Sequence, residues 1–175
     1  MTTTRQLWES ILTQGYDLDI ISVKNKSINP FAILAAIADV ESEFGHKIKK
    51  RYEKNFAPGG KLFQKESYDF FGKDCCYTWG AWQIIGTELF QLGLESLHRI
   101  ENNFDIACTY AVLFMNKKIE YATNLNDIAD MYHKINHGDN EVCFDYIRLI
   151  SESYAVRLGQ VQKYYITGDP SIFND

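Results

Sequence analysis

The chain has 175 residues, of which 46% are hydrophobic and 14% aromatic, enough to bury a sizeable core in one domain. The formal net charge is −5, which argues against a nucleic-acid partner because nucleic acids favour a clustered basic surface. We find neither a signal peptide after Met1 nor an apolar run long enough to span a membrane.

Most of the chain carries the apolar spacing of helices, and almost none of it alternates with a period of two residues. We therefore predict a mainly helical fold without a large sheet. The predicted helices cover residues 4–13, 30–44, 88–92, 94–100, 103–121, 126–134 and 141–165. The helix at 103–121 is expected to be the central one, and the last helix is expected to break near Gly159. Residues 46–78 lack a clean period and are predicted to form a small irregular or β-containing lobe.

The helix at 30–44 carries the most informative residue of the chain, Glu41. Asn29 and Pro30 favour a helix start, and Gly45 can close the helix. Apolar residues share the helical face of Glu41 by their spacing: Leu34, Ile37, Ala38 and Phe44. A carboxyl group on such a face is costly to ionise, so we expect its pKa to rise, as a general acid working near neutral pH requires. The competing interpretation is an ordinary carboxylate near a helix end.

A second group of residues lies between Tyr77 and Gly86. Gly80 permits a close backbone approach, and Gln83 offers a donor and an acceptor beside two tryptophans. Flat aromatic faces with an amide suit sugar rings and their N-acetyl groups. Packing in the core explains the tryptophans equally well but leaves Gln83 unexplained.

A third group lies at the end of the helix predicted at 126–134. Tyr132 and Asn136 are four residues apart and share a helical face if the helix extends that far. His133 and His137 have the same spacing, which suits metal ligands, but a metalloprotease helix needs a glutamate at the position of Lys134. We expect no metal ion and no cofactor.

Taken in this order, the three groups resemble the motifs of the lysozyme superfamily, most closely those of soluble lytic transglycosylases and goose-type lysozymes. The matching stretches are Glu41-Ser-Glu-Phe44, Thr78-Trp-Gly-Ala-Trp-Gln-Ile84 and Ile135-Asn-His-Gly138. Arg51-Tyr-Glu-Lys-Asn-Phe56 also looks like a stretch of some bacterial and phage members. The resemblance covers residues 28–150 of a domain expected to span 1–175. It departs from the family where Ile135 stands in place of a tyrosine, for which Tyr132 is a candidate substitute. It departs also in the segment between the first two motifs, which is long for a minimal transglycosylase domain.

The resemblance implies a lysozyme-like fold, in which a helical bundle surrounds a central helix and a small lobe completes a glycan cleft. It implies a glycosidase that cleaves the β-1,4 bond between N-acetylmuramic acid and N-acetylglucosamine in peptidoglycan, with Glu41 as the general acid. A hydrolase also needs a second carboxylate, for which Glu53 is favoured over Asp69 and Asp74, whereas a lytic transglycosylase needs none. The resemblance leaves both reactions open. The substrate-binding residues that it implies are Thr78, Gly80, Gln83, Tyr132, Asn136, Tyr52 and Tyr77.

Two other interpretations stay open. One is a catalytically silent lysozyme-like module that binds glycan or serves as a structural part of a phage or secretion assembly. Ile135 favours this module, whereas the presence of Glu41 with Gln83 opposes it. The other is a helical interaction domain in which the motif matches are accidental.

The expected partners are peptidoglycan glycan strands, and the protein is expected to be a monomer. We expect it to be made in the cytoplasm and to reach the cell wall by release or delivery, for example with phage or secretion machinery. The basic run His46-Lys-Ile-Lys-Lys-Arg51 can face an anionic polymer, although a solvated loop is the favoured interpretation. The cysteines are expected to be reduced thiols: Cys75, Cys76, Cys108 and Cys143.

Overall fold

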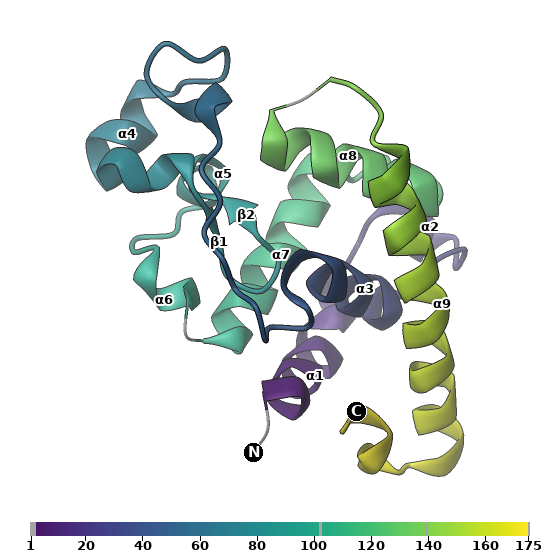
Figure 1. The fold of residues 1–175 in the computed structure, drawn as a ribbon. Helices are drawn as coiled ribbons and strands as arrows, with labels where there is room; N and C mark the ends of the chain where they lie inside the picture. Colours follow the sequence, from purple (N-terminus) through teal and green to yellow (C-terminus); the bar gives the residue numbers. More distant parts are fainter. Residues whose placement is uncertain (1–2, 102, 139, 175) are drawn as a thin grey trace.

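The computed structural model describes residues 3–101, 103–138 and 140–174, and within them the fold is mainly helical with a small two-stranded sheet, as predicted (Figure 1). The helices are α1 (Thr3–Gln14), α2 (Ile21–Lys24), α3 (Pro30–Ser42), α4 (Lys65–Phe71), α5 (Gly86–Gln91), α6 (His98–Glu101), α7 (Phe104–Lys118), α8 (Leu125–His137) and α9 (Phe144–Thr167). Short 3-10 helices lie at Gly15–Asp17, Lys54–Phe56, Gly72–Cys76 and Pro170–Phe173. In these ranges, no helix has both the length and the apolar character that crossing a bilayer requires.

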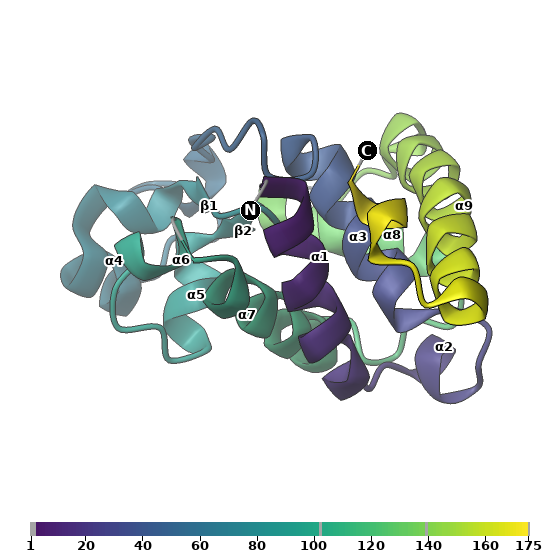
Figure 2. The same cartoon turned by 90° about the horizontal axis from the view of Figure 1, so that it is seen from below.

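Helix α3 is the most deeply buried of these helices. Every residue from Phe31 to Ala38 is buried, and α1 and α9 pack along the helix (Figures 1 and 2). Alanines make up much of this stretch, and their small side chains let neighbouring helices approach from several sides. The prediction that the helix at 103–121 is central was wrong, because α7 buries one face while Leu113 on the other is 42% exposed.

The two ends of α3 are built by local hydrogen bonds. At the start, the Asn29 side chain accepts hydrogen bonds from the backbone N–H groups of Phe31 and Ala32, as predicted for a capping residue. At the other end, the helix stops at Ser42, whose hydroxyl accepts a hydrogen bond from the Gly45 N–H at 2.9 Å. Glu43, Phe44 and Gly45 all have left-handed backbone angles. The helix therefore ends two residues earlier than predicted, and Glu41 lies in its last turn.

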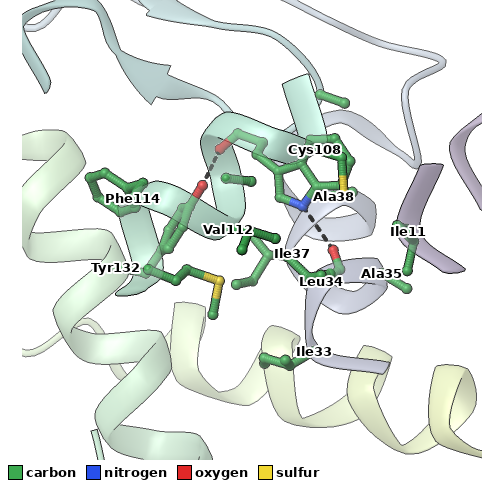
Figure 3. Packing of buried hydrophobic residues seen from close by; sticks show 14 of the residues in the cluster. Ile11, Ile33, Leu34, Ala35, Ile37, Ala38, Cys108, Val112, Phe114 and Tyr132 are labelled. Atoms are coloured by element: carbon green, nitrogen blue, oxygen red, sulfur yellow. Dashed lines mark hydrogen bonds between the residues drawn. The ribbon is translucent and has the colours of Figure 1, made fainter. Parts of the chain in front are cut away.

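A β-hairpin connects the core to the small lobe. Strands β1 (Thr78–Trp79) and β2 (Ile84–Ile85) are antiparallel, and their turn packs on two helices. The Trp82 indole N–H donates a hydrogen bond to the Leu34 carbonyl of α3 at 2.9 Å, and the Tyr132 hydroxyl of α8 donates to the Trp82 carbonyl at 2.5 Å (Figure 3). Both donors are buried, so these bonds fix the hairpin relative to α3 and α8.

The segment before the hairpin forms the rest of the small lobe, which lies on the side of the molecule opposite α9 (Figure 1). The Thr78 N–H donates to the Arg51 carbonyl, the Glu53 N–H donates to the Cys76 carbonyl, and Tyr52 and Tyr77 form an isolated β-bridge. Residues 51–53 thereby lie along the hairpin as an added edge. Residues 46–78, which lack a clean sequence period, hold two 3-10 helices and α4 and lead into β1.

Helix α9 and the cysteines bear on two further predictions. The break expected near Gly159 is absent, because α9 runs without interruption from Phe144 to Thr167. A Cβ atom at Gly159 would meet nothing within 4 Å. This glycine therefore lowers the stability of the helix only through its low helix propensity, by about 1 kcal/mol relative to alanine. All four cysteines are free in the structure, and the sulfur atoms of the neighbouring Cys75 and Cys76 lie 3.7 Å apart.

Candidate functional site

The carboxyl group of Glu41 lies at the centre of the candidate site. Its side chain is only 4% exposed, in the last turn of α3 beneath the start of α9. The Tyr146 hydroxyl of α9 donates a hydrogen bond to Oε1 at 2.7 Å, and Nη1 of Arg51 lies 3.8 Å from Oε2. These contacts hold the carboxyl group from two directions, from α9 and from the edge of the small lobe.

Burial raises the pKa of Glu41 above its ordinary value of 4.5. The positive charge of Arg51 and the hydrogen bond from Tyr146 act in the opposite direction but do not cancel the effect of burial. Glu41 therefore keeps its proton to a higher pH than an exposed glutamate does, which is the property required of a general acid.

Arg51, Glu53 and His137 form a closed network beside Glu41. The Arg51 Nε–H donates to Oε1 of Glu53 at 2.7 Å, and Nδ1 of His137 lies 3.1 Å from the same oxygen. Nη2 of Arg51 lies 2.9 Å from Nε2 of His137. Because arginine can only donate, Nε2 of His137 is assigned as the acceptor of this hydrogen bond, and Nδ1–H as the donor to Glu53. The network orients the guanidinium group that faces Glu41.

Glu53 differs from Glu41 in its protonation. Burial raises the pKa of Glu53, but the hydrogen bonds from His137 and Arg51 outweigh that effect, and the pKa lies below its ordinary value. The site thus holds one carboxyl group that favours its proton and one that is ionised, in contact with the same arginine. Such a separation of pKa values is typical of sites that perform acid–base chemistry.

A cleft of about 470 Å³ opens beside Glu41. Its lining comes from the end of α3, from the segment that follows it and from the hairpin turn: Val40, Glu41, Ser42, Glu43, Lys47, Lys49, Lys50, Arg51 and Gln83. Neither Asp69, which pairs with Lys65 on the surface of α4, nor the exposed Asp74 is among these residues. Of the carboxylates predicted as a partner for Glu41, the structure thus brings only Glu53 into the network beside it.

Gln83 occupies the hairpin turn in an unusual conformation. It is a non-glycine residue with a left-handed φ of 49°, and only 1% of it is exposed. Its amide N–H donates to the Gly80 carbonyl at 2.8 Å, and its amide oxygen accepts from the Thr78 hydroxyl at 2.6 Å. That hydroxyl in turn accepts from the Arg51 N–H at 3.1 Å. These three predicted site residues therefore hold the turn against the strand of Arg51, and backbone strain of this kind is often found at functional sites.

Asn136 is fully buried behind the cleft. Its side-chain oxygen accepts from the Ile85 N–H of β2 at 2.9 Å, and its side-chain nitrogen donates to the Tyr132 carbonyl at 3.1 Å. Since the Tyr132 hydroxyl is bound to Trp82, the hydroxyl beside Glu41 comes from Tyr146 instead. Asn136 and Tyr132 position the hairpin and contact no open surface of the cleft.

Tyr52 and Tyr77 lie together on the small lobe and are not among the residues that line the Glu41 cleft. Their ring centroids are 5.2 Å apart, and Tyr52 is 45% exposed. Tyr52 instead borders a hollow of about 450 Å³ near the turn at 58–60. The substrate-binding roles predicted for these tyrosines stay predictions.

Tyr146 and His137 have roles in the site that could not be predicted from the sequence. Tyr146, Ile150 and Ser153 follow the spacing of one helical face and are buried on α9, so a predicted core face of this helix was the available signal for Tyr146. His137 contacts both Arg51 and Glu53 through its ring nitrogens. Within the described ranges, no group of three or more histidine, cysteine and acidic side chains is arranged to hold a metal ion.

Comparison of the chain with protein-family models, with curated proteins and with solved structures finds no match. Any function proposed for the chain therefore depends on the motifs and on the geometry around Glu41.

Proposed function

We propose that this chain is a peptidoglycan-degrading glycosidase with a lysozyme-like arrangement, in which Glu41 protonates the oxygen of the scissile β-1,4 bond. The observation that supports it most is Glu41 itself, a buried carboxyl group with a raised pKa that lines an open cleft. The order of the three motifs along the chain supports the same proposal. The buried α3, with a small hairpin-bearing lobe beside it, also supports the proposal.

Glu53 bears on which reaction follows protonation. Its Oε1 atom accepts hydrogen bonds from both Arg51 and His137, and its pKa is lowered. A carboxylate held in this way is a weak base, so it is poorly suited to activate water. We therefore propose the transglycosylase reaction over hydrolysis, with Glu53 acting through Arg51 as a positioning residue.

In the proposed reaction, Glu41 gives its proton to the leaving oxygen while the bond from that oxygen to C1 breaks. The substrate's own N-acetyl oxygen stabilises the positive charge that develops at C1. The ionised Glu41 then takes the proton of the 6-hydroxyl group as that oxygen bonds to C1, which closes a 1,6-anhydro ring and restores the acid. Tyr146 and Arg51 stabilise the transient Glu41 carboxylate, since both favour its ionised form.

The product ends separate the candidate reactions. Purified peptidoglycan is digested with the protein in water enriched in ¹⁸O, and the fragments are analysed by mass spectrometry. We expect 1,6-anhydro ends that are lighter by one water than reducing ends and that carry no ¹⁸O. Reducing ends that carry ¹⁸O would instead identify a hydrolase. A folded protein that binds peptidoglycan but releases no fragments would contradict both reactions and support the silent module.

A further inference from the structure

Lysines gather on the wall of the cleft that contains Glu41. Lys47, Lys49 and Lys50, here called the lysine rim, line the same cleft as Glu41 and Arg51. The chain as a whole has a net charge of −5, so this local concentration of positive charge opposes the overall balance. A basic surface of this kind raises the local concentration of anionic ligands.

The rim lysines differ in how far other residues already neutralise them. Nζ of Lys47 lies 2.7 Å from a Glu43 carboxylate oxygen, in a pair of which both members are more than half exposed. Nζ of Lys50 lies 3.0 Å from a Glu101 oxygen and 3.7 Å from the ring centroid of Trp79. Lys49 is exposed and makes no ion pair with any residue in the described ranges. It is therefore the rim cation most available to a ligand.

The charge of the cleft lining is positive. The lining holds the rim lysines and Arg51 as cations, and its acidic members are Glu41 and Glu43. With Glu41 in its acid form, Glu43 is the one anion among these lining residues, and Glu53 and Glu101, outside the lining, pair with Arg51 and Lys50. The excess positive charge that remains is that of Lys49. A neutral sugar polymer has no use for this excess charge, whereas a glycan with pendant carboxylates does.

We infer that the lysine rim binds the carboxylates of the peptides attached to the muramic acid residues, so that the cleft selects peptidoglycan over uncharged N-acetylglucosamine polymers. This inference rests on the proposed function and names the part of the substrate that the cleft recognises. Lysine suits the task because its flexible stem and point charge adapt to carboxylates at variable positions along a peptide. The basic run is an exposed loop, as the favoured interpretation predicts, and the inference assigns this loop a ligand.

The test compares peptidoglycan sacculi in their native state with the same sacculi after their free carboxylates have been converted to amides. Wild type, the double variant Lys47→Gln/Lys49→Gln and the single variant Lys163→Gln are each assayed on both. Lys163 is an exposed lysine of α9 outside the cleft, so its replacement controls for the loss of a lysine charge elsewhere on the surface. Binding is measured in parallel by sedimentation with the sacculi, which needs no cleavage.

On native sacculi, we expect the double variant to lose activity and binding by about two- to fivefold for each lysine, mainly through KM. On amidated sacculi it should match wild type, which also shows that the variant is folded. The Lys163→Gln variant should behave as wild type on both. Equal losses of the double variant on both substrates, or no loss on native sacculi, would overturn the inference.

A failure of the proposed function gives a different result. In that case wild type releases no fragments from either form of the sacculi. Sedimentation still measures how tightly the lysine rim binds the sacculi. If wild type bound native sacculi more tightly than amidated sacculi and the double variant did not, that difference would support carboxylate binding by the lysine rim even then. Equal binding of wild type to native and amidated sacculi would overturn it.

Discussion

Replacing Glu41 with glutamine should lower the rate of peptidoglycan cleavage by about 10²- to 10⁴-fold, which is the contribution typical of a general acid. Glutamine keeps the shape of the protonated acid and can still accept the hydrogen bond from Tyr146, but it has no proton to give to the leaving oxygen. The expected loss therefore comes from chemistry, with little change in binding to sacculi. Fragments released over time and sedimentation with sacculi measure the two effects separately.

The same substitution should raise the stability of the fold at neutral pH. The folded-state pKa of Glu41 is raised, so the contribution of this group to stability is fully present below the unfolded value of 4.5 and is lost as the pH rises through the folded value. Glutamine stays neutral at every pH and avoids that loss. The melting temperature of Glu41→Gln should exceed that of wild type at neutral pH and converge with it below about pH 4.

Glu152→Gln is a matched control for both effects. Glu152 lies on α9 with its side chain 61% exposed and pairs with Arg148 at 3.0 Å. Its replacement should leave cleavage unchanged and alter the free energy of unfolding by less than about 0.5 kcal/mol. If Glu41→Gln cleaved peptidoglycan at the wild-type rate, Glu41 could not be the acid. If it melted below wild type at neutral pH, the burial argument for its pKa would fail.

Replacing Asn136 with alanine should cost about 2–3 kcal/mol of the free energy of unfolding. The change leaves the Ile85 N–H of β2 without its acceptor in a buried site and removes the bond to the Tyr132 carbonyl. It also releases the hairpin from α8, and with it the turn that carries Gln83. Cleavage activity should fall even at temperatures where the variant remains folded, because the wall of the cleft is less well positioned.

Denaturant unfolding followed by circular dichroism measures this loss. Asn140→Ala, at an exposed asparagine four residues further along the chain, should change stability by less than about 0.5 kcal/mol. A wild-type stability for Asn136→Ala together with weakened binding to sacculi would show instead that Asn136 contacts the glycan directly, as the motif match implies.

The parts of the fold that local interactions determine were predictable from the sequence. Asn29 and Pro30 identify the start of α3 because both act within the first helical turn. Glu41 stands out because its neighbours on one helical face are apolar. The end of α3 was placed too late, since Ser42 and two left-handed non-glycine residues stop the helix before Gly45, and glycine is the usual signal for such angles.

The residues that contact Glu41 could not be predicted from the sequence, because they come from distant segments of the chain. Tyr146 is 105 residues away from Glu41 along the chain, and nothing in either local pattern pairs them. Likewise, the bond between Arg51 and His137 joins residues 86 apart. The sequence motifs single out the amides of Gln83 and Asn136, but whether an amide binds substrate or the protein's own backbone depends on tertiary packing.

The most direct test of Glu41 as a buried acid is the titration of its own carboxyl carbon, followed by NMR in ¹³C-labelled protein, with Glu41→Gln to assign the signal. The midpoint should lie above 4.5 and coincide with the alkaline limb of the cleavage profile, because activity needs the protonated acid and is lost as the pH rises through its pKa. Tyr146→Phe should move both midpoints upward together, since the Tyr146 hydrogen bond lowers this pKa. A Glu41 midpoint at or below 4.5 would contradict the assignment of Glu41 as the general acid.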